Sequence, residues 1–162
     1  MTWMRRGIHQ TKNMPAEPTP TFIDDYLPAL LAQASQLIST EFHEVVRRHN
    51  LSVTEWRILS TLLGAGEISI GNLAQVTLTK QPTVTRLLDR LETLGHLRRI
   101  AHESDRRITL VRITDTGQAL IADLAVQAKR HEEEVLARLA PLDSEALKAT
   151  LRRVIAEYRE PI

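Results

Sequence analysis

Positively charged side chains gather in one part of the sequence, between Lys80 and Arg112. Eight residues of this stretch are basic and four are acidic, so it carries a net charge of +4, whereas the whole chain carries +1 and the remainder −3. Clustered guanidinium and ammonium groups bind phosphate oxygens, which is the chemistry of a nucleic-acid interface. The basic residues are Lys80, Arg86, Arg90, Arg98, Arg99, Arg106, Arg107 and Arg112.

The first half of this stretch is predicted to be a helix from about Thr79 to Leu94, with Thr79 as its N-cap and Gly95 ending it. Apolar residues at helical spacing give the helix one buried side and leave polar groups on the rest of its surface. Amide and hydroxyl groups read base edges or hold phosphates, and the N–H groups at a helix N-terminus also favour a phosphate. The candidate DNA contacts on this helix are Lys80, Gln81, Thr83, Thr85 and Arg86.

The second half is predicted to be a β-hairpin, because residues 97–101 and 108–113 are rich in branched side chains. Arg98 and Arg99 lie on its first strand, and Arg106 and Arg107 lie at or near its tip. An arginine on a protruding tip fits the narrow minor groove of DNA. We expect Asp105, beside them, to orient a neighbouring guanidinium through a bidentate ion pair.

Helices are also predicted around this basic stretch. Ser52 and Glu55 have the spacing of a capping box, Thr114 can cap a long helix, and Asp143 can cap the last one. The predicted helices cover residues 22–49, 52–63, 70–76, 115–139 and 143–159. A short helix, a turn, a second helix and then a basic hairpin form a winged helix-turn-helix, so the fold class is mainly α with a small β element.

Each piece alone also has a purely structural interpretation. A helix with one apolar stripe is most often part of a core, and an arginine-rich hairpin is often a solvated edge that prevents strand aggregation. The combination is more specific, because it supplies major-groove, minor-groove and phosphate contacts in one rigid unit.

The sequence resembles the MarR family of winged-helix transcription regulators over roughly residues 22–160. The resemblance lies in LSVTEWRILSTL (51–62), NLAQVTLTKQPTVTRLLDRLETLGHLRR (72–99) and SDRRITLVRITDTG (104–117), which includes the Asp-x-Arg of the wing. It implies a homodimeric DNA-binding regulator, most often a repressor. Two recognition helices would enter successive major grooves of a pseudo-palindromic double-stranded operator, about 34–36 Å apart.

The same resemblance sets the expected organisation of the chain. Residues 1–21 hold three prolines and few apolar side chains, which is typical of a flexible arm. Residues 22–162 are expected to form a single domain. Within it, residues 51–114 would be the winged helix-turn-helix, and residues 22–50 and 115–162 would be dimerisation helices.

Regulators of this kind commonly respond to a ligand held between the dimerisation and DNA-binding parts. By family resemblance the effector is a small organic anion, typically an aromatic carboxylate or a phenol. The candidate ligand-binding residues are Phe42, His43, Arg47 and Trp56, near the junction of the first two helices. Each also has a structural interpretation, as core residue, satisfied histidine or solvated cation.

Several classes of function lack support in the sequence. The chain has no cysteine, which excludes thiol redox sensing, and its six histidines lack metal-ligand spacing, so no metal site is predicted. There is no glycine-rich phosphate loop, nucleophile elbow or recognisable carboxylate pair, so we expect neither an enzyme nor a cofactor. No secretory signal and no run of about 18 apolar residues is present, which predicts a cytoplasmic protein without a membrane partner. A metal-responsive regulator, and a winged helix used for protein assembly or architectural DNA binding, remain as alternatives.

Overall fold

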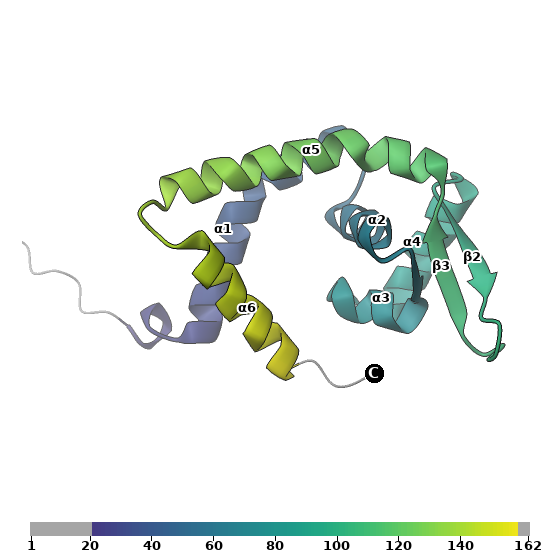
Figure 1. Ribbon diagram of the computed structural model, residues 1–162, viewed down its shortest axis with the longest axis horizontal. Helices are drawn as coiled ribbons and strands as arrows, with labels where there is room; N and C mark the ends of the chain where they lie inside the picture. Colours follow the sequence, from purple (N-terminus) through teal and green to yellow (C-terminus); the bar gives the residue numbers. More distant parts are fainter. Residues whose placement is uncertain (1–20, 159–162) are drawn as a thin grey trace, which may run out of the picture. The chain divides into compact units, whose positions relative to one another are not determined.

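The computed structural model describes residues 21–158 (Figure 1). The predicted arm at residues 1–21 therefore lies, except for Thr21, outside the described residues. Packing divides the chain into two compact units with their boundary between Leu37 and Ile38, inside helix α1 (Leu27–Arg48).

The first unit holds a short 3-10 helix, η1 (Phe22–Asp24), and the first part of α1. The Asp24 carboxylate accepts hydrogen bonds from the backbone N–H and the hydroxyl of Thr21, at 2.7 and 2.8 Å. Phe22 and Tyr26 stack with their ring centroids 5.1 Å apart. Pro28 falls in the first turn of α1, where its missing N–H removes no helical hydrogen bond.

The second unit contains the rest of α1 and every other element. The predicted helices and both predicted strands are present, except that the helix predicted over residues 22–49 is divided into η1 and α1. The fold class is confirmed as a winged helix. The elements are α2 (Val53–Ala65), β1 (Glu67–Ser69), α3 (Ile70–Val76), α4 (Gln81–Thr93), β2 (Leu97–Ala101), β3 (Thr109–Ile113), α5 (Asp115–Arg138) and α6 (Ser144–Tyr158).

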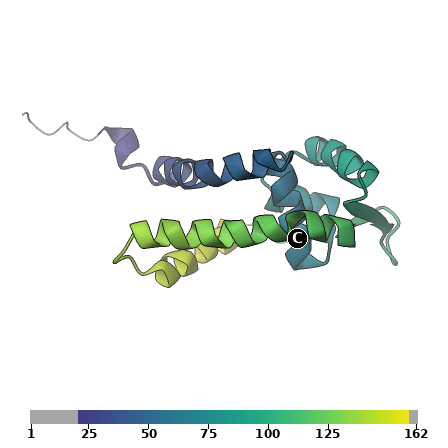
Figure 2. The same ribbon diagram turned by 90° about the horizontal axis from the view of Figure 1, so that it is seen from above.

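The three strands form one antiparallel sheet in the order β1-β3-β2. β1 was not predicted, because three residues carry too little alternation to indicate a strand. It matters for the hairpin, since pairing with β1 attaches β3 to the helices. Figures 1 and 2 show the hairpin of β2 and β3 at the start of α5, which continues from it as one long helix.

An aliphatic core lies between the helices and the inner face of this sheet. Three apolar residues of α4 are completely buried in it, which fixes the side of α4 that faces the protein. The buried hydrophobic residues are Phe42, Val46, Leu51, Ile58, Leu59, Leu62, Leu73, Ala74, Val84, Leu88, Leu91, Leu97, Val111, Ile113, Ile121 and Leu124.

Three of the four predicted helix caps are confirmed. Ser52 and Glu55 form the capping box of α2, the Thr114 hydroxyl accepts from the N–H of Gly117, and Asp143 accepts from the N–H of Ala146. The prediction for Thr79 is wrong, because the N-cap of α4 is Lys80. The N–H of Thr79 instead donates to the Ala74 carbonyl at 3.0 Å, so this residue closes the end of α3.

We expect Gly117→Ala to lower the free energy of unfolding by about 1–3 kcal/mol, the usual effect of overpacking. A Cβ on Gly117 would lie 2.0 Å from the His96 carbonyl oxygen and 2.8 Å from Ile113 Cγ1, and the backbone oxygen cannot move aside cheaply. Gly64→Ala in α2 is the matched control, since its Cβ meets nothing within 4 Å. Urea denaturation followed by circular dichroism measures both, and equal stability of the two variants would contradict the predicted clash.

Candidate nucleic-acid interface

The placement of α4 decides which polar side chains reach solvent. α3, the turn after it and α4 form the helix-turn-helix, with Val84, Leu88 and Leu91 of α4 fully buried. The turn passes through Leu78, which has a positive φ of 52°. The side of α4 opposite the buried stripe faces away from the core and is available to a ligand.

One flank of α4 is tied to α2 by an ion pair that the sequence analysis did not predict. The Arg90 Nη1 donates to Glu55 Oε1 at 2.7 Å, and the Glu55 side chain is only 1% exposed. The other carboxylate oxygen of Glu55 accepts from the N–H of Ser52 at 2.8 Å. One buried carboxylate therefore caps α2 and also binds α4 through Arg90.

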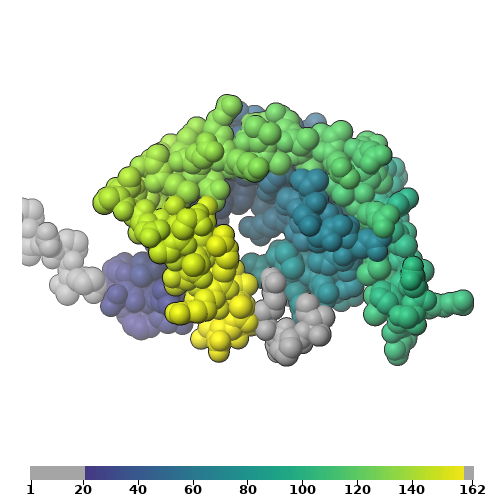
Figure 3. Space-filling view, in the orientation of Figure 1, coloured from purple at the N-terminus to yellow at the C-terminus, as the bar shows by residue number. Residues whose placement is uncertain are grey.

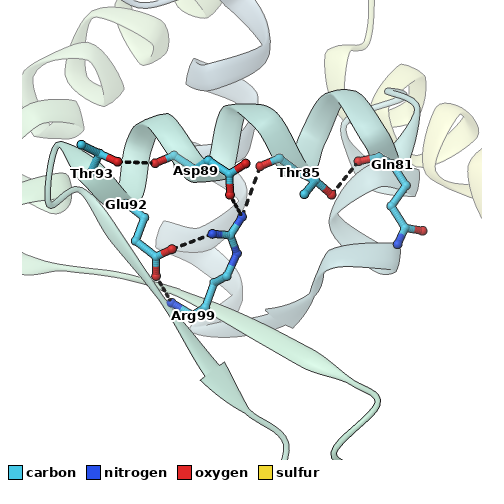
Figure 4. A network of polar contacts seen from close by, with 6 residues as sticks. All are labelled: Gln81, Thr85, Asp89, Glu92, Thr93 and Arg99. Atoms are coloured by element: carbon cyan, nitrogen blue, oxygen red, sulfur yellow. Dashed lines mark hydrogen bonds and ion pairs between the residues drawn. The ribbon is translucent and has the colours of Figure 1, made fainter.

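The other flank of α4 is tied to the hairpin by Arg99 (Figure 4). Its Nη1 donates to Glu92 at 2.6 Å, and its Nη2 donates to Asp89 at 2.7 Å and to the Thr85 carbonyl at 3.2 Å. The backbone N–H of Arg99 also donates to Glu92, at 2.8 Å. Arg99 was predicted as a DNA contact, but its side chain is turned towards the protein.

The polar residues predicted on α4 lie around its N-terminal half. Lys80, Gln81 and Arg86 are exposed, and Thr83 and Thr85 are partly buried. The Thr85 hydroxyl donates to the Gln81 carbonyl at 3.0 Å, so only its lone pairs remain for a ligand. Among the described residues, Lys80 and Arg86 have no ion-pair partner, which leaves both charges free for an anion.

The tip of the hairpin presents Arg107 in a fixed orientation. Its Nε and Nη2 each donate to one Asp105 oxygen at 3.0 Å, which confirms the predicted bidentate pair. The side chain of Arg107 is nevertheless 90% exposed. This hydrogen bonding lowers the pKa of Asp105 and raises the pKa of Arg107, so both groups stay charged near neutral pH. Arg106, beside it, is exposed.

A histidine that the sequence analysis did not single out shapes this tip. The Nδ1 of His102 accepts from the backbone N–H groups of Ser104 and Asp105, both at 3.3 Å. His102 thereby orders the loop that carries Asp105.

A hollow of about 630 Å³ separates the hairpin from the helix-turn-helix. Gln81 from α4, Asn72 from α3 and both Arg107 and His102 from the hairpin line it. Donors thus converge from two sides on one space, as a bound phosphate or sugar requires. The hairpin stands out from the helices in the space-filling view (Figure 3). Asn72 lies beside this hollow because β1, which leads into α3, pairs with β3, and no local motif indicates that pairing.

Arg98 lies on the opposite face of the sheet from Arg99, because successive strand residues alternate. In the sheet register it stands opposite Arg112, which pairs with Glu67 on β1. Arg98 and Arg112 line a second hollow, of about 860 Å³, to which Arg99 also contributes. Two neighbouring residues that were predicted to share one role therefore differ in their partners, because the guanidinium of Arg99 is bound to α4 and Arg98 has no ion pair among the described residues.

The structure brings Phe42 and Trp56 together, two of the four residues predicted for a ligand site. Their rings meet edge to face with centroids 5.3 Å apart, and Phe42 also stacks on His131 of α5 at 5.9 Å. The Nε2 of His131 lies 2.8 Å from the Ile38 carbonyl oxygen, to which it can donate. A cavity of about 210 Å³ lies beside Phe42 and His131. His131 was missed because it is distant in sequence.

The other two predicted ligand residues are arranged differently. Arg47 forms an ion pair with Glu44 on the exposed side of α1. His43 is partly buried, and burial, together with the charges of Arg57 and Arg47, lowers its pKa below the ordinary value of 6.5. His43 is therefore neutral at neutral pH and adjoins a locally positive environment.

Comparison with known proteins places this geometry in a family. A model of the MarR family matches residues 49–108. The chain is 34% identical over 127 residues to the transcriptional regulator PecS of Dickeya dadantii, a match that covers 76% of each protein. The chain belongs to the MarR family. As a member of that family it is a DNA-binding transcription regulator.

Two further MarR-family relatives support the assignment. The crystal structure of the regulator SPO1453 from Silicibacter pomeroyi is 35% identical, covers 86% of this chain and 100% of its own, and superimposes with a TM-score of 0.75. The homoprotocatechuate degradative operon repressor of Escherichia coli is 28% identical over 132 residues, which cover 82% of this chain and 89% of the repressor.

Within residues 21–158, no group of three or more histidine or acidic side chains is arranged to hold a metal ion. In the same part of the chain, no helix has both the length and the apolar character needed to cross a membrane.

We expect Arg90→Met to lower the free energy of unfolding by about 1–3 kcal/mol, because it leaves a buried carboxylate oxygen of Glu55 without its charged donor. Arg86→Met is the matched control on the same helix and should change stability by less than about 0.5 kcal/mol, as exposed unpaired residues do. Chemical denaturation of both variants measures the difference. Equal effects would mean that the Glu55–Arg90 pair contributes nothing to stability.

Proposed function

We propose that this protein is a homodimeric repressor that binds a pseudo-palindromic operator and is released from it by a small aromatic carboxylate or phenolate. One observation carries the DNA-binding part of the proposal. An exposed arginine, Arg107, is oriented by two hydrogen bonds to Asp105 and lies across a hollow from Gln81 of α4. Exposed and orientationally fixed cations are suited to a duplex, since little side-chain entropy is lost on binding.

The proposed contacts fall into two sets. Lys80, Gln81, Thr83, Thr85 and Arg86 of the recognition helix α4 would enter the major groove, where amide and guanidinium groups read base edges. Arg107 and Arg106 at the tip of the wing, the β2–β3 hairpin, would reach the minor groove, with Asp105 as the orienting partner. Arg98, on the outer sheet face, would contact a flanking phosphate.

A second copy of the chain is the proposed partner of α6. No residue of α6 is buried within the chain, yet it carries a stripe of apolar side chains along one side. Unpartnered apolar surfaces of this kind mark association sites. A two-fold dimer would also set the spacing of two recognition helices on a palindrome. The stripe consists of Leu147, Leu151, Val154, Ile155 and Tyr158.

The proposed effector site is the aromatic cluster of Phe42, Trp56 and His131, with His43 nearby. Stacked and edge-to-face rings favour an aromatic guest, and the positive charges of Arg47 and Arg57 near His43 favour an anion. The relative in Escherichia coli represses an operon for the degradation of homoprotocatechuate, an aromatic carboxylate. The repressor role and the effector class are proposed on these grounds.

Arg107→Ala should weaken operator binding by roughly 5- to 150-fold, since a specific arginine contact is worth about 1–3 kcal/mol. Fluorescence anisotropy with an operator selected from random DNA measures this. Arg152→Ala on α6 changes the net charge equally and should leave affinity unaltered. Equal affinity of the Arg107 variant and the wild type would refute the proposed role of the wing.

Leu151→Glu should convert a dimer of about twice 18.4 kDa into monomers, because a charge would enter the apolar stripe of α6. Ala149→Glu, about 200° around the same helix, adds the same charge away from the stripe and should remain dimeric. Sedimentation at micromolar concentration distinguishes the two. A monomeric wild type, or a Leu151 variant that stays dimeric, would contradict the proposal.

An aromatic carboxylate should quench the fluorescence of Trp56, measured in a Trp3→Phe background that leaves it as the single tryptophan. A bound anion would raise the lowered pKa of His43, so binding takes up a proton and tightens as the pH falls. His43→Gln should flatten this dependence. Cyclohexanecarboxylate is the non-aromatic control. Binding of both acids with equal affinity, or no response of Trp56, would exclude this site.

A further inference from the structure

We propose that Arg99 is a positioning residue that fixes the direction of the wing relative to the recognition helix, and that it does not contact DNA. The inference rests on the proposed DNA binding, because it assigns a role within that interface. It replaces the prediction from the sequence, which treated Arg99 like the other arginines of the hairpin.

The contacts of Arg99 follow one line along α4. Its guanidinium bonds the Thr85 carbonyl and the carboxylates of Asp89 and Glu92, which are spaced four and three residues apart and so lie on one side of the helix. Figure 4 shows Arg99 rising from β2 to this side of α4. A single side chain therefore spans about two turns of the recognition helix.

The directions of these bonds leave Arg99 few free N–H donors for a phosphate. Both terminal nitrogens of Arg99 point to acceptors on α4, and the side chain is 23% exposed, compared with 90% for Arg107. The two ends of the Glu92 carboxylate bind the guanidinium and the backbone N–H of the same residue. Paired charges with this geometry resist reorientation toward a ligand.

The position of Arg99 on β2 allows its contacts to affect the direction of the hairpin tip. Leu97, Val111 and Ile113 hold the inner face of the hairpin in the core, and β1 pairs with β3. Arg99 lies at the middle of β2, level with Val111, on the strand that β1 does not pair with, and no other ion pair among the described residues ties the hairpin to α4. A small rotation there is amplified at Arg107, so the Arg99 contacts set the distance between the major-groove and minor-groove elements.

If charge alone determined DNA affinity, removal of Glu92 would have the opposite effect to the one expected from positioning. Glu92 and Asp89 are negative charges on a helix that would approach DNA, so removing one of them should strengthen binding if charge alone mattered. If Glu92 acts by holding Arg99, its removal should weaken binding. The sign of the change in affinity therefore separates the two effects.

The test compares Glu92→Ala with Glu103→Ala in the full-length protein on a selected operator. Glu103 is an exposed acid of the wing with no ion-pair partner within residues 21–158, so its removal is the matched charge control. We expect about tenfold weaker operator binding for Glu92→Ala, in the range of a lost specific contact, and unchanged or tighter binding for Glu103→Ala. Glu92→Gln serves as the conservative variant if the alanine variant does not fold.

Arg99→Ala provides a second readout in the same titrations. Loss of a phosphate contact lowers the slope of log K against log salt by about 0.9, whereas loss of positioning leaves that slope unchanged and reduces the preference for operator over random DNA. A reduced slope, or Glu92→Ala binding as tightly as wild type, would overturn the proposal for Arg99. A wild type that selects no DNA sequence would overturn the proposed function itself.

Discussion

The recognition helix depends on opposite charges that are paired on both of its flanks. The buried stripe of Val84, Leu88 and Leu91 fixes which side of α4 faces the core, but a stripe alone permits some rotation about the helix axis. Glu55 holds one flank through Arg90, and Arg99 holds the other through Asp89 and Glu92. These restraints leave one ridge of α4 facing outward, which is the ridge proposed to contact DNA.

This pairing changes the meaning of the basic stretch. Four of its eight basic residues, Arg90, Arg99, Arg107 and Arg112, have acidic partners, two of which, Glu55 and Glu67, lie outside the stretch. Charge density in the sequence therefore overstates the positive charge that is free for a ligand. Arg107 shows that an arginine can be paired and still be exposed, because its partner orders the guanidinium without covering it.

Helix α5 links the two proposed sites physically. It begins directly after β3. There the Thr114 hydroxyl donates to the Gly95 carbonyl, and Gly117 lies close to the His96 carbonyl oxygen. Further along, the same helix presents His131 to Phe42 and to the Ile38 carbonyl. A ligand that changes the packing at Phe42 would thus act on an element continuous with the wing, as a coupling between two sites requires.

The sequence by itself determined what depends on near neighbours in the chain. Apolar spacing located the helices, Ser52 with Glu55 and Thr114 marked their starts, and Asp105 bound the guanidinium two residues away. Such contacts need only local backbone geometry, so a short motif specifies them.

Only the tertiary structure decided the roles of residues whose partners are distant. Arg90 and Glu55 are 35 residues apart, the three-residue strand β1 exists only by pairing with β3, and strand alternation sent Arg98 and Arg99 to opposite faces. The sequence listed these arginines together because their chemistry is identical. Packing of the sheet against α4 separated them, since a side chain's partners are set by the surface it is turned towards.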